Sequence, residues 1–500
     1  MLRASRLAVV ALCLLGPVAL RAALPAVPVP AGNPVTEPKR VLGKILFWDE
    51  QLSSDNTIAC GSCHRPASGG ADPRVGRYPG TDKGTIDDVL GSPGIVSLDS
   101  NGLQRHDPVF GDAVQVTPRT SPSFFGAIWA PEVFWDGRAG GEFRDPLSGA
   151  VALAAGGALE NQALASLAND AEMAKAGRTW AELAAKLERA TPLALATDLP
   201  PDARAALEQS PRYPDLFRAA FGDPAITPVR IAFAIATYER TLVADQTPWD
   251  RYMAGDTTAL SPSELFGWRA MQDFHCINCH EPPLFTNNGF FNIGLRRIEY
   301  DRGRENVTHD PEDAGEVKVP SLRNVGLRPR FMHTGEFGTI GAAVSFYRTT
   351  PALVGRDDIP GAGIYAFNMG PVTEADLRAF LSTALTDPRV RDETFPFDRP
   401  RLRSERDVDD ALAPAAPADL TAARTTHGIA LRWTAARDDT GVVDYVVLRG
   451  ERVIGRPTET RFTDEDPTAE PMPTYRVIAR DAAGNESSPA IATPDPATSD

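Results

Sequence analysis

The chain has 500 residues, of which 42% are hydrophobic and 23% are charged, as in an ordinary globular protein. This length exceeds what one compact core accommodates, so we expect about three domains. The 51 Lys and Arg against 66 Asp and Glu give a net charge of −15. No nucleic-acid partner is expected, because phosphate binding needs a basic face.

Residues 1–23 have the pattern of a secretory signal peptide. Basic residues come first, an apolar run extends over residues 7–20, and small residues follow at Ala22 and Ala23. We therefore expect an exported protein. Because the run is too short to cross a bilayer comfortably, we expect no stable membrane span after removal of the signal. An uncleaved anchor is the alternative.

A helix is expected directly before each of two copies of the motif C-x-x-C-H. Residues 41–47 place their apolar side chains on one helical face. Residues 261–264 have the sequence of a capping box with proline at the first helical position, and this helix is expected to pass through Met271. The chain therefore contains two copies of one arrangement.

Both motifs spell C-x-x-C-H. They lie at Cys60, Cys63 and His64 and at Cys276, Cys279 and His280. In this pattern the thiols bond to the vinyl groups of a c-type haem and the histidine coordinates iron, so we predict two covalently bound c-type haems. A redox cysteine pair or half of a zinc site is the alternative, and the histidine in both copies argues against it. Since c-type haem is attached outside the cytoplasm in bacteria, the motifs and the signal together predict a periplasmic protein.

The segment between the two motifs contains an expected loop followed by expected helices. Residues 69–120 are rich in Gly, Pro and Asp and are expected to form a long surface loop. Residues 163–187 and 229–242 have helical patterns. The composition changes after Asp387, and we place a linker at 401–413.

Beyond the linker the hydrophobic period changes to two. Ile429, Leu431 and Trp433 alternate with other residues, and further short strands are expected at 442–448 and 475–479. These strands, the single tryptophan and the lack of cysteine resemble a fibronectin type III domain over residues 414–493. We interpret this domain as a spacer or docking module rather than as part of the chemistry.

Several short segments occur in the order seen in bacterial di-haem cytochrome c peroxidases, the family that includes MauG. They lie at residues 42–44, 134–139, 159–163, 172–173, 320–325 and 331–335. With both haem motifs, the resemblance covers about residues 36–395. It implies a mainly α fold with two cytochrome c-like haem domains, a peroxidatic one at 36–215 and an electron-transfer one at 216–400. The all-β immunoglobulin-like (fibronectin type III) sandwich follows.

The resemblance also implies roles around the first haem. The haem on His64 corresponds to the peroxidatic haem, with Glu172 and Gln162 as catalytic residues of its distal pocket. A carboxylate beside an open iron can take a proton from peroxide and deliver it to the leaving oxygen. Trp135 corresponds to a tryptophan between the two haems. From composition alone, the alternative for Glu172 is an exposed glutamate on a helix. The alternative for Trp135 is an aromatic residue of the core.

The chain departs from its relatives near this pocket. Residues 140–158 contain an insertion rich in Gly and Ala, and Ser166 replaces a common proline. Many relatives block the first iron with a loop histidine, and Gly80 occupies that position here. We therefore expect an open first haem. His106 is the other histidine of the loop, and we interpret it as a surface residue.

The expected sixth ligand of the second haem is also unusual. Downstream of His333, where standard peroxidases of the family have a methionine ligand, this chain has Tyr347, which resembles MauG. Anionic phenolate stabilises ferric iron, whereas a thioether favours ferrous iron. Met369 or Met332 as the ligand is the alternative. The resemblance further implies a calcium ion near residues 328–330, where the side chains differ from the common pattern.

Together these features predict a periplasmic peroxidase that reduces hydrogen peroxide at the His64 haem. Electrons are expected through the His280 haem and Trp135 from a small cytochrome c, a cupredoxin or a protein side chain, as in the MauG branch. Two alternatives stay open. One is a non-catalytic di-haem electron-transfer cytochrome, and the other is a redox-linked adhesion or cell-surface protein that uses the fibronectin-like domain.

Overall fold

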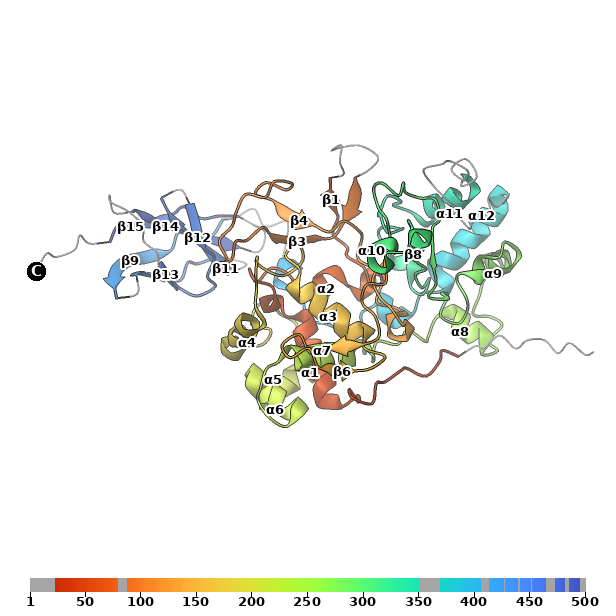
Figure 1. Ribbon diagram of the computed structural model, residues 1–500, viewed down its shortest axis with the longest axis horizontal. Coiled ribbons are helices and arrows are strands. Elements are labelled where there is room, and N and C mark those ends of the chain that lie inside the picture. Colours follow the sequence, from red (N-terminus) through yellow and green to blue (C-terminus); the bar gives the residue numbers. More distant parts are fainter. Residues whose placement is uncertain are drawn as a thin grey trace, which may run out of the picture.

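The computed structural model describes residues 23–79, 88–349, 369–405, 413–426, 428–438, 441–450, 452–464, 473–481 and 485–494. A helical part is followed by a β-domain, which lies at one end of the molecule (Figure 1). Nearly all of the expected signal peptide, Gly80 and most of the expected linker lie outside the described residues. Within the described ranges, no helix is both long and apolar enough to cross a membrane.

The N-terminal haem domain is mainly helical. Its helices are α1 (Glu37–Trp48), α2 (Cys60–Cys63), α3 (Ala158–Ala168), α4 (Trp180–Arg189), α5 (Pro201–Gln209), α6 (Tyr213–Phe221) and α7 (Pro228–Glu239). The expected helix at 41–47 is confirmed as part of α1. α1 packs closely on α7, because a Cβ at Gly43 would lie only 1.9 Å from the Ala234 carbonyl oxygen. Only glycine permits this approach.

One apolar core joins α1, α3 and α7. It contains residues from Val41 to Ala244, and Val390, Phe397 and Leu402 join it from the chain that follows α12. α7 therefore packs within the first domain, although the expected boundary after residue 215 assigned it to the second. A helical pattern shows which face is buried but not which haem motif that face packs against.

The expected helix over residues 163–187 is instead two helices, α3 and α4, separated by a turn that contains Glu172. Asn169 ends α3, because its carbonyl oxygen accepts hydrogen bonds from backbone N–H groups of that turn. Thr179 then starts α4 with a reciprocal capping box to Glu182. The hydrophobic period continues across the break, which is why sequence periodicity did not reveal it.

Short antiparallel strand pairs extend from this domain. They are β1 (Gly76–Tyr78) with β2 (Val89–Gly91), β3 (Pro93–Val96) with β4 (Val114–Val116), and β5 (Phe143–Arg144) with β6 (Val151–Leu153). Residues 69–120 therefore have more structure than the expected surface loop, and Ile95 and Val116 are buried. The insertion at 140–158 forms the β5–β6 hairpin.

The C-terminal haem domain contains α8 (Pro248–Met253), α9 (Pro262–Asp273), α10 (Glu305–Thr308), α11 (Ile340–Thr349), α12 (Pro371–Ala379) and α13 (Pro388–Arg391). β7 (Phe290–Phe291) pairs with β8 (Val317–Lys318). The expected capping box between Ser261 and Glu264 is confirmed at the start of α9. Trp249, Phe285 and Phe380 pack at the centre of this domain's core. α9, α11 and α12 lie on the side of the molecule away from the β-domain (Figure 1).

The β-domain consists of two antiparallel sheets. Its strands are β9 (Ala418–Thr425), β10 (Gly428–Thr434), β11 (Val442–Arg449), β12 (Arg452–Gly455), β13 (Arg461–Asp464), β14 (Tyr475–Asp481) and β15 (Ala490–Ala492). One sheet has the order β13-β10-β9 and the other β12-β11-β14-β15. Leu431 and Trp433 of the first sheet share one core with Val447 and Val477 of the second. The strands expected from the period of two are confirmed.

Candidate active site

Both C-x-x-C-H motifs form short helical turns, α2 and η4 (Cys276–Asn278). Nδ1 of His64 lies 3.2 Å from the carbonyl oxygen of Gly70, and Nδ1 of His280 lies 3.1 Å from that of Phe285. An Nδ1–H that donates to a carbonyl leaves the Nε2 lone pair available to a metal. Burial lowers the pKa of both histidines. The imidazoles therefore stay neutral, as coordination requires.

The surroundings of the first motif fit a covalently bound haem. All four thiols are free, and a cavity of about 710 Å³ borders Cys63 and His64. No group of three or more His, Cys, Asp or Glu side chains that could hold a metal ion occurs in the part of the chain that the structure describes. Free thiols, a neutral imidazole held by one nitrogen and a large adjoining cavity are what haem attachment needs.

The expected distal residues meet in this cavity. Gln162 and Glu172 both line it, together with Ser166. The Gln162 amide donates to the Ser166 hydroxyl oxygen at 3.1 Å, and the Ser166 hydroxyl is near enough to the Glu172 carboxylate to lower its pKa. The serine that replaces the common proline thus links the two predicted catalytic side chains. Burial raises the pKa of Glu172, and the Ser166 hydrogen bond and the charge of Arg138 oppose this rise.

Sequence reasoning missed Glu239, a second buried carboxyl of the same site. It ends α7 and lines the cavity next to Cys60 and Cys63. Burial raises the pKa of Glu239 to about 8, although the charge of Arg240 opposes the rise. The sequence signal that could have identified Glu239 is its position as an acidic residue at the C-terminal end of an apolar helix, where the helix dipole disfavours negative charge.

A buried ion pair fixes α3, which carries Gln162, against α7. Arg240 donates from Nη1 and Nη2 to the two carboxylate oxygens of Glu160, at 2.7 and 3.0 Å. The Asn33 amide donates to the same carboxylate at 3.0 Å. Since Glu160 lies in the first turn of α3, the pair holds the helix end that carries Gln162. The ion pair therefore fixes the wall of the cavity that contains Gln162.

Trp135 lies where the two haem domains meet. Its Nε1–H donates to the Thr120 carbonyl oxygen at 2.8 Å, and its own carbonyl oxygen accepts the Lys318 N–H at 2.8 Å. The centroid of its ring lies 6.1 Å from that of His333. The indole is buried and lines the cavity beside His64. It thus contacts segments of both domains, as a side chain between two cofactors must.

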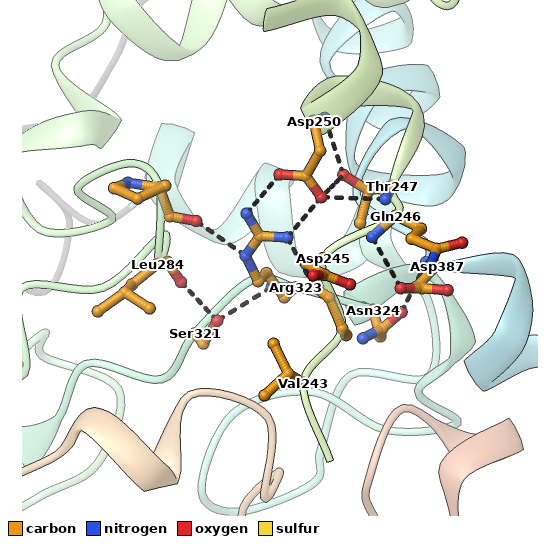
Figure 2. A network of polar contacts seen from close by, with 12 residues as sticks. Val243, Asp245, Gln246, Thr247, Asp250, Leu284, Ser321, Arg323, Asn324 and Asp387 are labelled. Carbon is orange, nitrogen blue, oxygen red and sulfur yellow. Dashed lines mark hydrogen bonds and ion pairs between the residues drawn. The ribbon is translucent and has the colours of Figure 1, made fainter. Parts of the chain in front are cut away.

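A buried arginine organises the loop that carries the second haem motif (Figure 2). Arg323 donates from Nη1 and Nη2 to both carboxylate oxygens of Asp250, at 2.9 and 2.7 Å. Its Nε–H donates to the Pro283 carbonyl oxygen at 2.8 Å, and Ser321 donates to the Leu284 carbonyl oxygen at 2.6 Å. The segment after His280 is therefore tied to α8 through one guanidinium.

We expect Arg323→Ala to lower the free energy of unfolding of the C-terminal haem domain by about 3–5 kcal/mol, because Asp250 is left with an uncompensated charge in a buried site. Arg348→Ala is the matched control. It removes a half-exposed pair with Glu374 and should cost no more than about 1 kcal/mol. Thermal and urea denaturation measure both. Equal losses in the two variants would contradict the assigned role.

Tyr347 lies on α11 close to the second haem motif. Burial raises the pKa of Tyr347, and the neighbouring thiols of Cys276 and Cys279 raise it further. An unbound phenol there stays protonated, so a phenolate at this position requires a cation next to it. Met369 packs in the apolar core of the domain. The Met332 carbonyl oxygen accepts a hydrogen bond from the Thr120 hydroxyl at 3.0 Å.

Two further predicted positions have defined surroundings. His106 is exposed and its Nδ1 lies 3.1 Å from the Asp112 carboxylate, so it is a surface residue as expected. At residues 328–330, where the resemblance implies calcium, the Arg328 guanidinium donates to the carbonyl oxygens of Ser121 and Arg330, at 3.3 Å each. The positively charged side chain of Arg328 thus already binds backbone carbonyl oxygens at this position.

A sequence profile of the family described as di-haem cytochrome c peroxidase matches residues 37–258. Methylamine utilization protein MauG of Methylophilus methylotrophus is 27% identical over 360 residues, which are 71% of this chain and 85% of that protein. The chain belongs to the di-haem cytochrome c peroxidase and MauG family. It is accordingly a di-haem oxidoreductase, and membership of this family implies two c-type haems.

Other relatives of this di-haem peroxidase cover similar shares of its chain. Cytochrome c peroxidase Ccp of Escherichia coli is 28% identical over 327 residues, which are 64% of this chain and 55% of that protein. Cytochrome c551 peroxidase of Pseudomonas aeruginosa is 28% identical over 63% of this chain and 72% of its own. The crystal structure of a MauG-like protein associated with microbial copper homeostasis matches 75% of this chain and 96% of its own. That match has a TM-score of 0.52 and 25% identity.

Proposed function

We propose that this di-haem peroxidase reduces hydrogen peroxide to water at the haem bound by His64. The observation that carries the proposal is that Gln162, Ser166 and Glu172 line one cavity beside that histidine, with Gln162 hydrogen-bonded to Ser166 and Ser166 next to Glu172. The haem, when bound, supplies an iron that binds peroxide and passes electrons to it. The side chains of the set handle the protons.

Glu172 acts as the acid–base residue. Its carboxylate would take a proton from one oxygen of the peroxide and return it to the other, so that the latter leaves as water. A pKa raised by burial suits both transfers, because an acid–base group works best when its pKa lies near the working pH. Ser166 and Gln162 act as positioning residues that hold the carboxylate in one orientation.

We expect Ser166→Ala to move the acidic limb of the pH–rate profile for peroxide reduction to higher pH. The Ser166 hydroxyl stabilises the ionised Glu172 carboxylate, so its removal raises the pKa of Glu172. Only the ionised form accepts a proton, so the variant loses rate first at low pH. Stopped-flow rates over the acidic to neutral range measure the limb. Ser148→Ala, on the exposed β5–β6 hairpin, should not move it, and an unchanged limb in Ser166→Ala would contradict the assigned effect of Ser166 on the pKa of Glu172.

We propose that electrons enter at the haem bound by His280 and pass through Trp135. The contacts of Trp135 with Thr120 on one side and with Lys318 on the other support this route. The donor is a small cytochrome c, a cupredoxin or an oxidisable side chain of a protein substrate. The acidic net charge of the chain, −15, favours a donor with a basic docking face.

Tyr347 is the proposed sixth ligand of the second haem. Its nearness to Cys276 and Cys279 supports this assignment, as does the apolar packing of the alternative ligand Met369. A phenolate ligand suits a centre that holds oxidising equivalents, whereas a thioether suits a store of electrons. The proposal therefore places this chain with the MauG-like branch.

The remaining parts of the proposal concern location and accessory features. The signal-like residues 1–23 and two c-type haems support a periplasmic site. The strand orders β13-β10-β9 and β12-β11-β14-β15 support a fibronectin type III-like domain at 414–493. Calcium is not part of the proposal, because the Arg328 guanidinium already supplies a positive charge to the carbonyl oxygens near residues 328–330.

Electron paramagnetic resonance of the purified holoprotein, before and after mixing with hydrogen peroxide, tests the function. We expect a high-spin ferric signal from the His64 haem that peroxide abolishes, together with peroxide-dependent oxidation of a reduced small cytochrome c. Two low-spin haems that react with neither peroxide nor cyanide would overturn the proposal and leave an electron-transfer cytochrome.

A further inference from the structure

A buried arginine joins the β-domain to the loop that enters the first haem motif. Arg403 donates from Nη2 to the Asn56 carbonyl oxygen at 2.8 Å and from Nη1 to the Val443 carbonyl oxygen of β11 at 3.2 Å. Asn56 belongs to residues 53–59, which lead into Cys60 and which we call the approach loop. The guanidinium thus bridges the β-domain and the approach loop directly.

Opposite charges meet at the same contact. Asp55 of the approach loop lies within electrostatic range of Arg403, Arg456 and Arg480. Arg480 in turn makes two hydrogen bonds to Asp444 of β11, at 3.0 and 2.6 Å. Charges that are this well buried destabilise a structure when their partners are removed. The contact therefore depends on the β-domain being in place.

The β-domain also holds the segment between β3 and β4. Leu103 of that segment packs against the core of the β-domain, and Arg456 donates to the Gln104 side-chain oxygen at 3.0 Å. Figure 1 shows β11 and β12 next to the β3–β4 hairpin. The β-domain thus contacts the peroxidatic domain at two separate segments.

Both segments support the turn that carries Glu172, residues 169–176, which we call the distal turn. From the approach loop, the Ser54 N–H donates to the Met173 carbonyl oxygen at 2.8 Å, and the Ser54 hydroxyl oxygen accepts the Lys175 N–H at 2.8 Å. Both bonds hold the residues that directly follow Glu172 in the sequence. The approach loop therefore fixes the backbone that presents the acid.

The β3–β4 hairpin supports the distal turn from another side. Gly94 of β3 packs so closely that a Cβ there would lie 1.9 Å from the Ala171 carbonyl oxygen. The Gln115 amide of β4 donates to the Asp170 carbonyl oxygen at 2.7 Å. An unbroken series of packed contacts thus runs from the β-domain to the residues on either side of Glu172.

We propose that the C-terminal β-domain is a brace for the peroxidatic site. By clamping the approach loop and the β3–β4 hairpin, it holds Cys60 and Glu172 in their relative positions. Arg403 and Arg456 are the positioning residues of this brace. The clamping itself does not depend on the proposed function, whereas its effect on peroxide reduction rests on it.

Hydrogen–deuterium exchange of the full-length holoprotein tests the brace. We expect Arg403→Ala and Arg456→Ala to increase exchange at residues 53–59 and 169–176 by roughly 10-fold or more, because each variant removes a buried charged donor that holds these segments. Arg461→Ala is the matched control, since this exposed arginine of the same domain pairs only with Glu459 among the ion pairs described. It should leave exchange unchanged.

Cyanide association gives a second readout that needs no turnover. Its rate constant at the His64 haem should change in the Arg456→Ala variant, while the spectrum of the His280 haem stays the same as an internal reference. Should Arg403→Ala fail to fold, Arg456→Ala alone decides, because it removes the hydrogen bond to Gln104 and leaves the Arg403 bridge in place. Unchanged exchange and cyanide binding in Arg456→Ala would overturn the brace. If exchange changes in the variants but the protein does not reduce peroxide, the brace is supported and the proposed function is rejected.

Discussion

Glu172→Gln should lower the second-order rate constant for peroxide reduction by about 10²- to 10⁴-fold, the usual contribution of an acid–base group. Glutamine has nearly the same shape and still reaches the Ser166 hydroxyl, but it cannot accept and return a proton. The loss should therefore be chemical rather than structural. Stopped-flow spectroscopy of the ferric protein mixed with excess hydrogen peroxide measures the rate constant.

Two comparisons make this result specific to Glu172. Glu188→Gln replaces an exposed glutamate on α4 and should leave the rate constant within error of the unmodified protein. Cyanide should still bind to the His64 haem of Glu172→Gln, because the metal remains accessible. A variant that reduces peroxide at an undiminished rate would remove Glu172 from the mechanism and leave Glu239 as the next carboxyl of the cavity to examine.

Tyr347→Met should raise the reduction potential of the haem bound by His280 by on the order of 100 mV or more, because axial ligands set haem potentials over a range of about 0.8 V and a thioether favours ferrous iron. Spectroelectrochemical titration of the holoprotein measures this potential. The His64 haem serves as an internal reference, because its ligands are unchanged and its potential should move much less.

Met369→Leu is the matched variant for this ligand. It conserves volume in the apolar core that contains Met369, so it should cost little stability and leave the low-spin signal of the second haem unchanged. The opposite pattern, with a signal lost in Met369→Leu and kept in Tyr347→Met, would assign the sulfur as ligand. Tyr347→Phe separates loss of the phenolate from gain of the thioether.

The two haem-attachment sites and the strands of the β-domain could be predicted from local patterns. Cysteines and histidine of a C-x-x-C-H motif serve one cofactor within one short segment, so their spacing carries the chemistry. Alternation at Ile429, Leu431 and Trp433 likewise reports burial on one face of a strand. Glu172 and Trp135 needed the order of several segments, because neither residue is distinctive alone.

The site around Glu172 depends on contacts between segments far apart in the chain. Periodicity predicted one helix through this region, whereas backbone bonds of Asn169 end α3 and leave Glu172 on a turn. The bridging role of Ser166 and the burial of Glu239 became visible only when α3 and α7 were packed together.

Chain pattern alone thus predicted which residues attach the haems, and it predicted the helix before each motif and strands of the β-domain. Folding in three dimensions settled which carboxyls share the cavity and that the β-domain is joined to the approach loop through Arg403. The physical reason is the range of the interactions. Covalent attachment and backbone periodicity act between neighbours in sequence, whereas burial, desolvation and charge pairing act between neighbours in space.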